Sequence, residues 1–376
     1  MSAKKLRIRS RHRQHPGVIA SLADFEWQAS ETVDMARLMD DPRLTLYCLD
    51  AATEQAIFTA TPAGIDLSRS PFMYQTQFDS AEYLVALPLF DFAGIADSIE
   101  PPGESILFLH NIGRCGSTLL CRALNEAPGV VAFSEPDALT GLLSLRHWSR
   151  SSVNDFFRAS LVWLFRPAVV SGTHFVVKLR NQAAGMLKPF IDAMPEATHL
   201  FMYRDAIDWL ASFHRLRVKR GDTPTRYSRA TVIEQQAAYY QCSLADIAKL
   251  APSAIRSYLG LEGRALAWLY MLERYLDCHD TGWPISALRY EDLQSNPDEV
   301  LKSVLAMMGL PDADGSAAQR VFQSDAQAGT RFARDGQRGN TVALPAEMQA
   351  TVSRLLALQP VINSADYTLP DTLRLE

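Results

Sequence analysis

The chain has few cysteines, no CxxC pair and no long uninterrupted apolar run. Its five cysteines are an odd number spread over 376 residues, which excludes a disulfide-stapled fold and disfavours a thiolate metal site. We therefore expect reduced thiols and a cytoplasmic location. The longest apolar stretch, residues 83–96, is interrupted by Pro88 and Asp91 and is too short to cross a bilayer, so we expect neither a transmembrane segment nor a signal peptide.

The chain also lacks an excess of positive charge, because its formal net charge is −5. No nucleic-acid partner is expected, and an anionic ligand must be held by a local basic cluster. Residues 4–13 are the exception, with six Lys or Arg and no acid. Without interleaved aromatic residues or a following apolar stretch, a solvated basic tail over residues 1–15 is favoured over a nucleic-acid arm or a membrane tag. Its removal should change the isoelectric point without changing turnover.

With 48% hydrophobic residues, the rest of the chain is predicted to fold around a buried core. A turn-rich segment at residues 97–104 marks the main boundary. Residues 16–100 are predicted to form a small α+β region, with strands at 45–49, 56–60 and 83–87 and a helix at 31–39. Residues 104–376 form the second part, in which apolar runs alternate with amphipathic stretches. This pattern indicates an α/β fold, a parallel β-sheet with helices on both faces.

The second part contains five predicted strands, at residues 106–110, 130–133, 174–179, 198–203 and 285–290. Helices are predicted from Ser117, over 206–216, over 231–278 with breaks near Pro252 and Gly260, and from Asn296 or Pro297. Aromatic residues are frequent between 145 and 167. They could line a pocket, but at helical spacing they are more often core residues, which we expect here.

A candidate phosphate-binding loop, residues 111–118, follows the strand at 106–110 and precedes a helix. Backbone N–H groups of such a loop and the helix N-terminus converge on an anion. Gly113 and Gly116 allow the backbone to curl around Cys115, and the hydroxyls of Ser117 and Thr118 lie in the first helical turn. The alternative is an ordinary strand-to-helix turn capped by Ser. The Lys of GxxxxGK[ST] is missing, which disfavours an ATP-dependent phosphotransferase.

A second basic element lies about 90 residues later, where Arg204 ends a predicted strand and Ser212 lies on the next helix. These two side chains can share one phosphate only if tertiary packing brings the loop over them. The alternative is a surface Arg and a helical Ser that bonds to backbone. The segment 204–229 has seven basic residues against three Asp, which fits an edge that faces an anion.

Three motifs together resemble the sulfotransferases that use 3′-phosphoadenosine 5′-phosphosulfate (PAPS). They are GRCGSTLL, YRDAIDWLASFHR and RYEDL, the last followed by an Asn-Pro helix start and a Met-Gly-Leu end. The resemblance covers roughly residues 104–340 and not the first 100. It implies a P-loop NTPase-like fold and transfer of a sulfuryl group from PAPS to the hydroxyl of a small molecule, glycan, lipid or peptide. It further implies 3′-phosphoadenosine 5′-phosphate as product and no metal.

The resemblance also assigns roles to individual residues. Residues 113–118 would hold the 5′-phosphosulfate, and Arg114 would neutralise its oxygens. Lys178, at the end of a strand, would interact with the bridging oxygen or the sulfuryl group; the alternative is a Lys that only caps its strand. Arg204 and Ser212 would bind the 3′-phosphate. Arg331 and Arg338 would belong to a late loop that closes over the nucleotide, and a solvated basic loop is the alternative there.

The general base is where this chain departs from the cytosolic sulfotransferases. They carry Lys-Thr-His where this chain has Lys178-Leu179-Arg180, and an arginine cannot accept a proton. Glu135 follows the strand at 130–133 in a region where protein-tyrosine and some carbohydrate sulfotransferases carry their proposed base, so we assign that role to Glu135. The alternative is a Glu in a structural salt bridge. The alternative that the protein is a catalytically degenerate nucleotide-binding module stays open. Residues 1–100 are expected either to cap the acceptor cleft or to mediate association, for example into a homo-oligomer.

Overall fold

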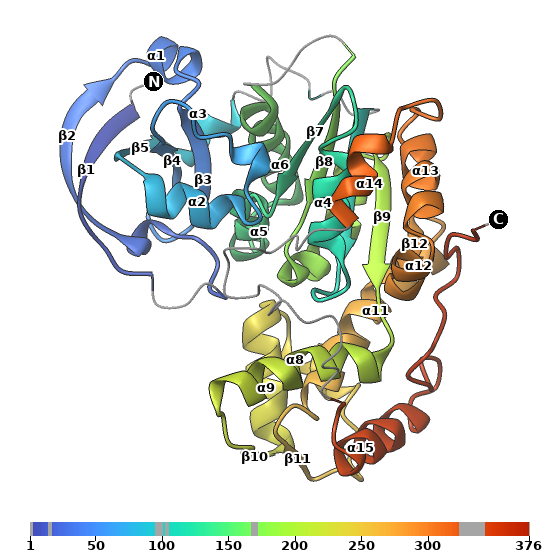
Figure 1. Cartoon of the computed structure of the whole chain (residues 1–376). Coiled ribbons are helices and arrows are strands. Elements are labelled where there is room, and N and C mark those ends of the chain that lie inside the picture. The colour runs from blue at the N-terminus through green and yellow to red at the C-terminus, as the bar shows by residue number, and fades with distance from the viewer. Residues whose placement is uncertain are drawn as a thin grey trace.

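The computed structural model describes residues 3–13, 17–94, 101, 105–166, 172–322 and 343–375. It contains two five-stranded sheets, packed side by side, and a helical layer beyond the end of the second sheet (Figure 1). The boundary predicted at 97–104 lies almost wholly outside the described residues.

The first sheet is antiparallel, with strand order β2-β1-β5-β4-β3. Its strands are β1 (Ala3–Arg11), β2 (Phe25–Val33), β3 (Leu44–Asp50), β4 (Gln55–Ala60) and β5 (Tyr83–Pro88). Its helices are α1 (Met35–Asp40), α2 (Met73–Ser80) and α3 (Leu89–Ala93), with short 3-10 turns η1 (Leu22–Asp24) and η2 (Leu67–Arg69). The three predicted strands are confirmed. The helix predicted over 31–39 is wrong in its first half, because β2 continues through Val33.

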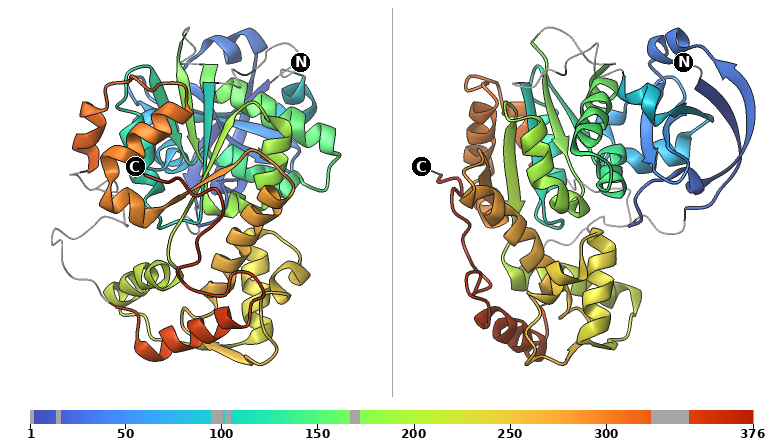
Figure 2. Two further views of the ribbon diagram at one scale, coloured as in Figure 1. Left: turned by 90° about the vertical axis from the view of Figure 1, so that its right-hand side faces the viewer. Right: turned by 180° about the vertical axis from the view of Figure 1, so that it is seen from behind.

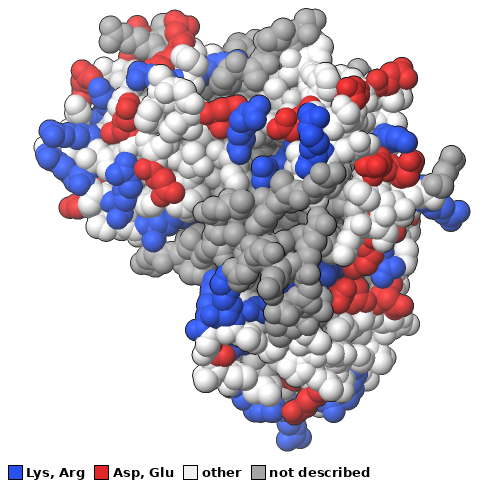
Figure 3. Space-filling view, in the orientation of Figure 1, with Lys and Arg blue, Asp and Glu red and all other residues white. Residues whose placement is uncertain are grey.

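The predicted solvated tail is also wrong, because most of it is strand β1. This strand pairs with β2 at Ala3↔Val33 and with β5 at Lys4↔Ala86, so both of its edges are occupied. Ala3 and Leu6 are buried, whereas most of the basic side chains point to solvent. Figure 3 shows basic side chains over this left-hand part of the molecule, where β1 and β2 lie. Lys4, Arg7, Arg9 and Arg11 are therefore exposed cations of strand β1, whereas the side chain of Arg13, which follows the strand, is buried.

The second sheet is parallel throughout, with strand order β12-β9-β6-β8-β7, which confirms the predicted fold class. Its strands are β6 (Ile106–Asn111), β7 (Val130–Ser134), β8 (His174–Lys178), β9 (Thr198–Tyr203) and β12 (Ser286–Arg289). Each was predicted to within one or two residues. Fully buried parallel strands read as continuous apolar runs, which are the easiest strands to recognise.

Helices cover both faces of this sheet, as Figure 2 shows. One face carries α4 (Ser117–Leu124), α13 (Pro297–Met307) and α14 (Ser316–Phe322), and the other carries α6 (Arg150–Phe165) and α7 (Leu187–Ala193). The remaining elements of this part are the following: α5 (Asp137–Gly141), α8 (Ala206–Arg220), β10 (Arg226–Ser228), α9 (Arg229–Tyr240), α10 (Leu244–Ala248), β11 (Ser257–Leu259), α11 (Arg264–Asp280), α12 (Tyr290–Ser295) and α15 (Ala346–Ala357).

The two sheets share one hydrophobic core, which lies around α6. Phe58 of β4 packs against Trp163 of α6 with ring centroids 4.6 Å apart. Arg166, after α6, donates hydrogen bonds to the carbonyls of Leu38, Asp41 and Leu44 at 2.9–3.0 Å. The aromatic residues Phe156, Phe157, Trp163 and Phe165 are core residues as predicted. The N-terminal region is thus packed onto the second part rather than tethered to it.

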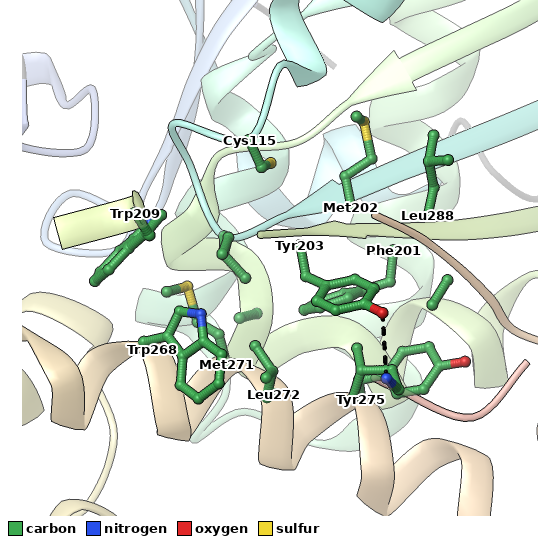
Figure 4. Close-up of a cluster of buried hydrophobic side chains, with 14 of the residues drawn as sticks. Cys115, Phe201, Met202, Tyr203, Trp209, Trp268, Met271, Leu272, Tyr275 and Leu288 are labelled. Atoms are coloured by element: carbon green, nitrogen blue, oxygen red, sulfur yellow. Dashed lines mark hydrogen bonds between the residues drawn. The ribbon is translucent and has the colours of Figure 1, made fainter. Parts of the chain in front are cut away.

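A second core surrounds β9 and extends to α11 (Figure 4). Phe201 and Tyr203 of β9 face Tyr275 of α11 there, and the Phe201 and Tyr275 ring centroids are 5.3 Å apart. The Tyr203 hydroxyl accepts a hydrogen bond from the backbone N–H of Leu369 at 3.2 Å. The C-terminal segment is thereby fixed against the sheet.

Two histidines are buried side by side in the parallel sheet. His110 Nε2 of β6 lies 3.1 Å from His199 Nδ1 of β9, and both side chains are almost fully buried. Burial lowers the pKa of His110 well below its ordinary value and lowers the pKa of His199 to about 4. Both rings are therefore neutral in the native protein near neutral pH.

This pair predicts an acid-sensitive fold. The unfolded chain takes up protons on these rings below a pH of about 6.5, whereas the native state does not, so stability is complete at neutral pH and falls as the pH drops from about 6.5 toward 4. Between pH 7.5 and 5.5 the free energy of unfolding in urea should fall by about 1.4 kcal/mol per histidine. His147→Gln, which removes an exposed ring, should keep this loss, whereas His199→Phe should reduce it. Equal stability of the wild-type protein at both pH values would contradict the expectation.

Candidate active site

The predicted site residues gather at the carboxyl edge of the parallel sheet. The loop after β6, Glu135 after β7, Lys178 at the end of β8 and Arg204 after β9 all lie at this edge. From β6 the chain crosses toward β7, whereas from β9 it crosses toward β12 on the other side. Ligands of open parallel sheets bind in the crevice that such a reversal creates.

The loop after β6 has the geometry of an anion cradle. Its residues Gly113, Arg114 and Gly116 have left-handed φ angles of 71°, 57° and 80°, and such turns direct successive backbone N–H groups into one concavity. Asn111 Oδ1 accepts the N–H of Gly113 at 2.9 Å, which fixes the start of the loop. The N-cap of α4 is Gly116, which has no side chain to satisfy the first helical amides, so these amides can serve a bound anion.

The third sequence motif packs directly on this loop. A Cβ atom on Gly116 would lie 2.9 Å from the ring of Tyr290 and 3.0 Å from Leu293 Cδ2. Glycine is therefore required at this position for space as well as for its φ angle. The sequence showed RYEDL only as part of a family resemblance, and the structure shows that its Tyr290 forms one wall of the loop.

Two buried tryptophans bond to the loop after β6 and to the residue that follows β9. Trp209 Nε1 of α8 donates to the carbonyl of Gly113 at 2.8 Å, and Trp268 Nε1 of α11 donates to the carbonyl of Arg204 at 2.9 Å. Both rings are at most 1% exposed, and both are drawn in Figure 4. The sequence analysis missed this role. The available signal was the position of Trp209 one turn into the helix after Arg204.

Arg204 reaches the loop after β6, so tertiary packing does bring that loop to this arginine. Its Nη1 donates to the carbonyl of Arg114 at 3.4 Å, and its guanidinium carbon lies 4.3 Å from the ring centroid of Tyr290. Its charge is balanced by Asp208 at 3.6 Å and Glu291 at 3.9 Å. Burial raises the pKa of the Glu291 carboxyl. All three motifs therefore meet at one place.

Ser212 is presented differently from the prediction. It is buried, and its hydroxyl donates to the carbonyl of Trp209 at 2.6 Å, within its own helix. A phosphate needs a hydrogen-bond donor, so Ser212 could serve one only after its hydroxyl rotates. Ser117 and Thr118 are buried in the first turn of α4, and burial raises the pKa of the Cys115 thiol. Arg331 and Arg338 lie outside the described residues.

Lys178 and Glu135 form an ion pair at the ends of adjacent strands. Lys178 Nζ donates to Glu135 Oε1, and the N–H of Glu135 donates to the carbonyl of Lys178 at 2.7 Å. The Lys178 side chain is 2% exposed and that of Glu135 is 14% exposed. Glu135 also has a left-handed φ angle of 58°, which is strained for a residue with a Cβ atom and is typical of functional positions. The structure thus brings the predicted base and the predicted lysine together.

The N-terminal region borders this ion pair, which the sequence did not reveal. Ser134 Oγ, just before Glu135, donates to the carbonyl of Pro71 at 2.7 Å. The next residue, Phe72, has its ring centroid 5.9 Å from Lys178 Nζ. A half-buried aromatic ring from the N-terminal region therefore lies beside the predicted lysine of this ion pair.

No protein-family model matches the chain, and no curated protein matches it. The similar solved structures include sulfotransferases. One of them, a sulfotransferase from Alicyclobacillus acidocaldarius, is 18% identical. The match covers 56% of this chain and 84% of that chain, with a TM-score of 0.35. Sulfotransferase STF9 from Mycobacterium avium is 13% identical; the match covers 72% of this chain and 80% of that chain, with a TM-score of 0.39. Mouse sulfotransferase SULT7A1 complexed with PAP is 14% identical; the match covers 71% of this chain and 88% of that chain, with a TM-score of 0.37.

These TM-scores and identities are too low to decide an activity, so the function depends on the geometry of the site. Among the described residues, no group of three or more His, Cys, Asp or Glu is arranged to hold a metal ion. None of the helices in the described part of the chain is both long and apolar enough to span a bilayer.

Proposed function

We propose that the protein is a sulfotransferase that moves a sulfuryl group from PAPS to an acceptor hydroxyl. The observation that carries the proposal is the meeting, at one sheet edge, of an anion cradle, a buried lysine and a partly exposed carboxylate. Sulfuryl transfer requires an aligned donor, neutralised oxygens and a base for the acceptor proton.

The residues present fit a nucleotide with phosphates at both its 5′ and 3′ positions. The loop 113–118 and the start of α4 would hold the 5′-phosphosulfate, and Arg114 within that loop would neutralise its oxygens. Arg204, which contacts the loop from β9, would bind the 3′-phosphate, with Ser212 as a second donor after rotation. Bound PAPS would supply the sulfuryl group and a bisphosphate leaving group.

Glu135 would take the proton from the acceptor hydroxyl. As the acceptor oxygen forms its bond to sulfur, the bond from sulfur to the 5′-phosphate oxygen breaks, and the bisphosphate keeps that electron pair. Lys178 would stabilise the negative charge that develops on the bridging oxygen. Because Lys178 bonds to Glu135 in this structure, its turn toward the donor would release the carboxylate for its role as base. The acceptor would be a hydroxyl of a small molecule, carbohydrate, lipid or peptide.

The nucleotide site can be tested by binding of the product. 3′-Phosphoadenosine 5′-phosphate should raise the melting temperature more than AMP or magnesium ATP, because only it offers a phosphate to both the loop and Arg204. Arg204→Ala removes a charge-assisted contact of about 1.5–3 kcal/mol and should weaken bisphosphate binding about tenfold to a hundredfold in calorimetry.

Arg215→Ala is the matched control, because Arg215 is an exposed cation on helix α8, which begins two residues after Arg204. It should leave bisphosphate affinity unchanged. Equal thermal shifts for the three nucleotides would reject the proposed function. Unchanged affinity in Arg204→Ala would reject the role of that residue.

A further inference from the structure

We propose that a buried cluster between the N-terminal region and the second part, built on Arg13, Tyr74, Arg180 and Asp137, positions Glu135 for catalysis. The inference rests on the proposed function, because it concerns the orientation of the proposed base. These four residues come from four separate places in the chain, and the side chains of all four are buried. The side chains of Arg13, Arg180 and Asp137 are each at most 6% exposed. We name this group the Tyr74 cluster.

Tyr74 is the shared contact of two guanidinium groups. The guanidinium carbon of Arg13 lies 4.4 Å from its ring centroid, and that of Arg180 lies 4.5 Å away. Buried cation–π contacts of this kind are worth more than exposed ones, since no water competes for the cation. The ring therefore ties the chain just after β1 to the end of the parallel sheet.

Asp137 completes the cluster by accepting hydrogen bonds from the second part and from the N-terminal region. Its Oδ2 accepts from Arg180 Nη1 at 2.8 Å and from the N–H of Ala20 at 2.7 Å, and it lies 3.5 Å from Arg13 Nη2. Arg13 is held further by the Tyr47 hydroxyl at 3.2 Å, which itself donates to Asp24 at 2.6 Å. The two arginines and two aspartates thus balance one another's charge. None of the four is a buried ion without a partner of opposite charge, which would be strongly destabilising.

Arg180 connects this cluster to the proposed base. Its Nε lies 4.0 Å from Glu135 Oε2, while Lys178 occupies Oε1. If Lys178 turns to the donor during the reaction, Arg180 is the cation that stays beside the carboxylate. Arg180 cannot take the acceptor proton, but it can hold the carboxylate in one orientation, and its planar fork is fixed by Asp137 and Tyr74. The residue that replaces the expected histidine is therefore a positioning residue.

The test compares turnover with nucleotide binding in matched variants. The assay is sulfuryl transfer from PAPS to 2-naphthol, a hydroxyl that must lose its proton, followed as formation of 3′-phosphoadenosine 5′-phosphate. Tyr74→Leu and Arg180→Lys should each lower kcat about tenfold to a hundredfold, since a misplaced catalytic group costs this much. The Kd for the bisphosphate should stay within about twofold of the wild-type value. Tyr74→Phe, which keeps the ring, should restore kcat to within about threefold.

Arg166→Lys is the control for a purely structural effect. Arg166 also joins the N-terminal region to the second part, and its guanidinium carbon lies 4.4 Å from the ring of Trp163, but it has no contact with Glu135. It should lower the melting temperature without lowering kcat. The inference is wrong if Tyr74→Leu and Arg180→Lys retain kcat, or if Arg166→Lys loses as much.

Crystal structures of the variants supply a readout that does not depend on activity. Tyr74→Leu should show the Glu135 carboxylate displaced or in several orientations, whereas Arg166→Lys should show it unchanged. An unmoved Glu135 in Tyr74→Leu would overturn the inference even if no transfer is measured. Failure of the wild-type protein to bind the bisphosphate would instead reject the proposed function.

Discussion

Glu135→Gln should lower sulfuryl transfer about a hundredfold to ten-thousandfold while leaving bisphosphate affinity nearly unchanged. A glutamine has the size of the native side chain but cannot accept the acceptor proton, and general base catalysis contributes about this factor. Steady-state kinetics with PAPS and calorimetry with the bisphosphate would separate the two effects. The loss should appear in kcat, because Glu135 has no contact with the loop 113–118 among its recorded partners.

Two companion variants sharpen this prediction. Glu135→Asp keeps a carboxylate but retracts it, so it should retain an intermediate rate. Glu126→Gln changes a more exposed carboxylate, one that pairs with Arg69 at the surface, and should leave turnover unchanged. If Glu135→Gln turns over normally, another group is the base, and the ion pair with Lys178 is structural.

Removal of residues 1–11 should abolish both transfer and cooperative folding of the N-terminal sheet. Strand β1 lies between β2 and β5, so its loss leaves two strand edges without partners and removes the buried side chains of Ala3 and Leu6. Losing one buried leucine side chain costs about 2–5 kcal/mol, which is a large share of the 5–15 kcal/mol that stabilises a typical domain. Circular dichroism on heating and the transfer assay would record the loss.

The control replaces charge but keeps the strand. Lys4→Thr together with Arg7→Thr removes two exposed cations of β1, and threonine is favoured in strands. This variant should change the isoelectric point while folding and transferring normally. A truncated protein that remains folded and active would contradict the structural role of β1 and would restore the interpretation as a dispensable tail.

Local sequence determined the parallel sheet and the phosphate loop. The runs at 106–110 and 198–203 are mostly apolar because both faces of their strands are buried, and this signal does not depend on distant partners. Gly113 and Gly116 mark the loop because only glycine adopts its φ angles without strain. The family resemblance, together with the lack of histidine after Lys178, assigned the base to Glu135, which the structure places beside that lysine.

Strands β1 and β2 were not predicted, because β1 carries its charges on the solvent side and β2 is exposed along most of its length. Such strands exist through their pairing with distant segments, which no local pattern encodes. Ser212 shows the same limit at the site: its spacing from Arg204 suggested a ligand, but packing of α8 directs its hydroxyl to Trp209.

The sequence by itself determined the α/β class and predicted the candidate loop and the residues at the strand ends, because these follow from local apolar pattern, glycine placement and the family resemblance. Only the tertiary structure decided what surrounds them. Arg13, Tyr74, Asp137 and Arg180 are neighbours solely because the antiparallel sheet packs against α6 and brings their segments to one edge. Contacts between residues so far apart in the chain are fixed by burial and close packing, which act on the folded molecule as a whole.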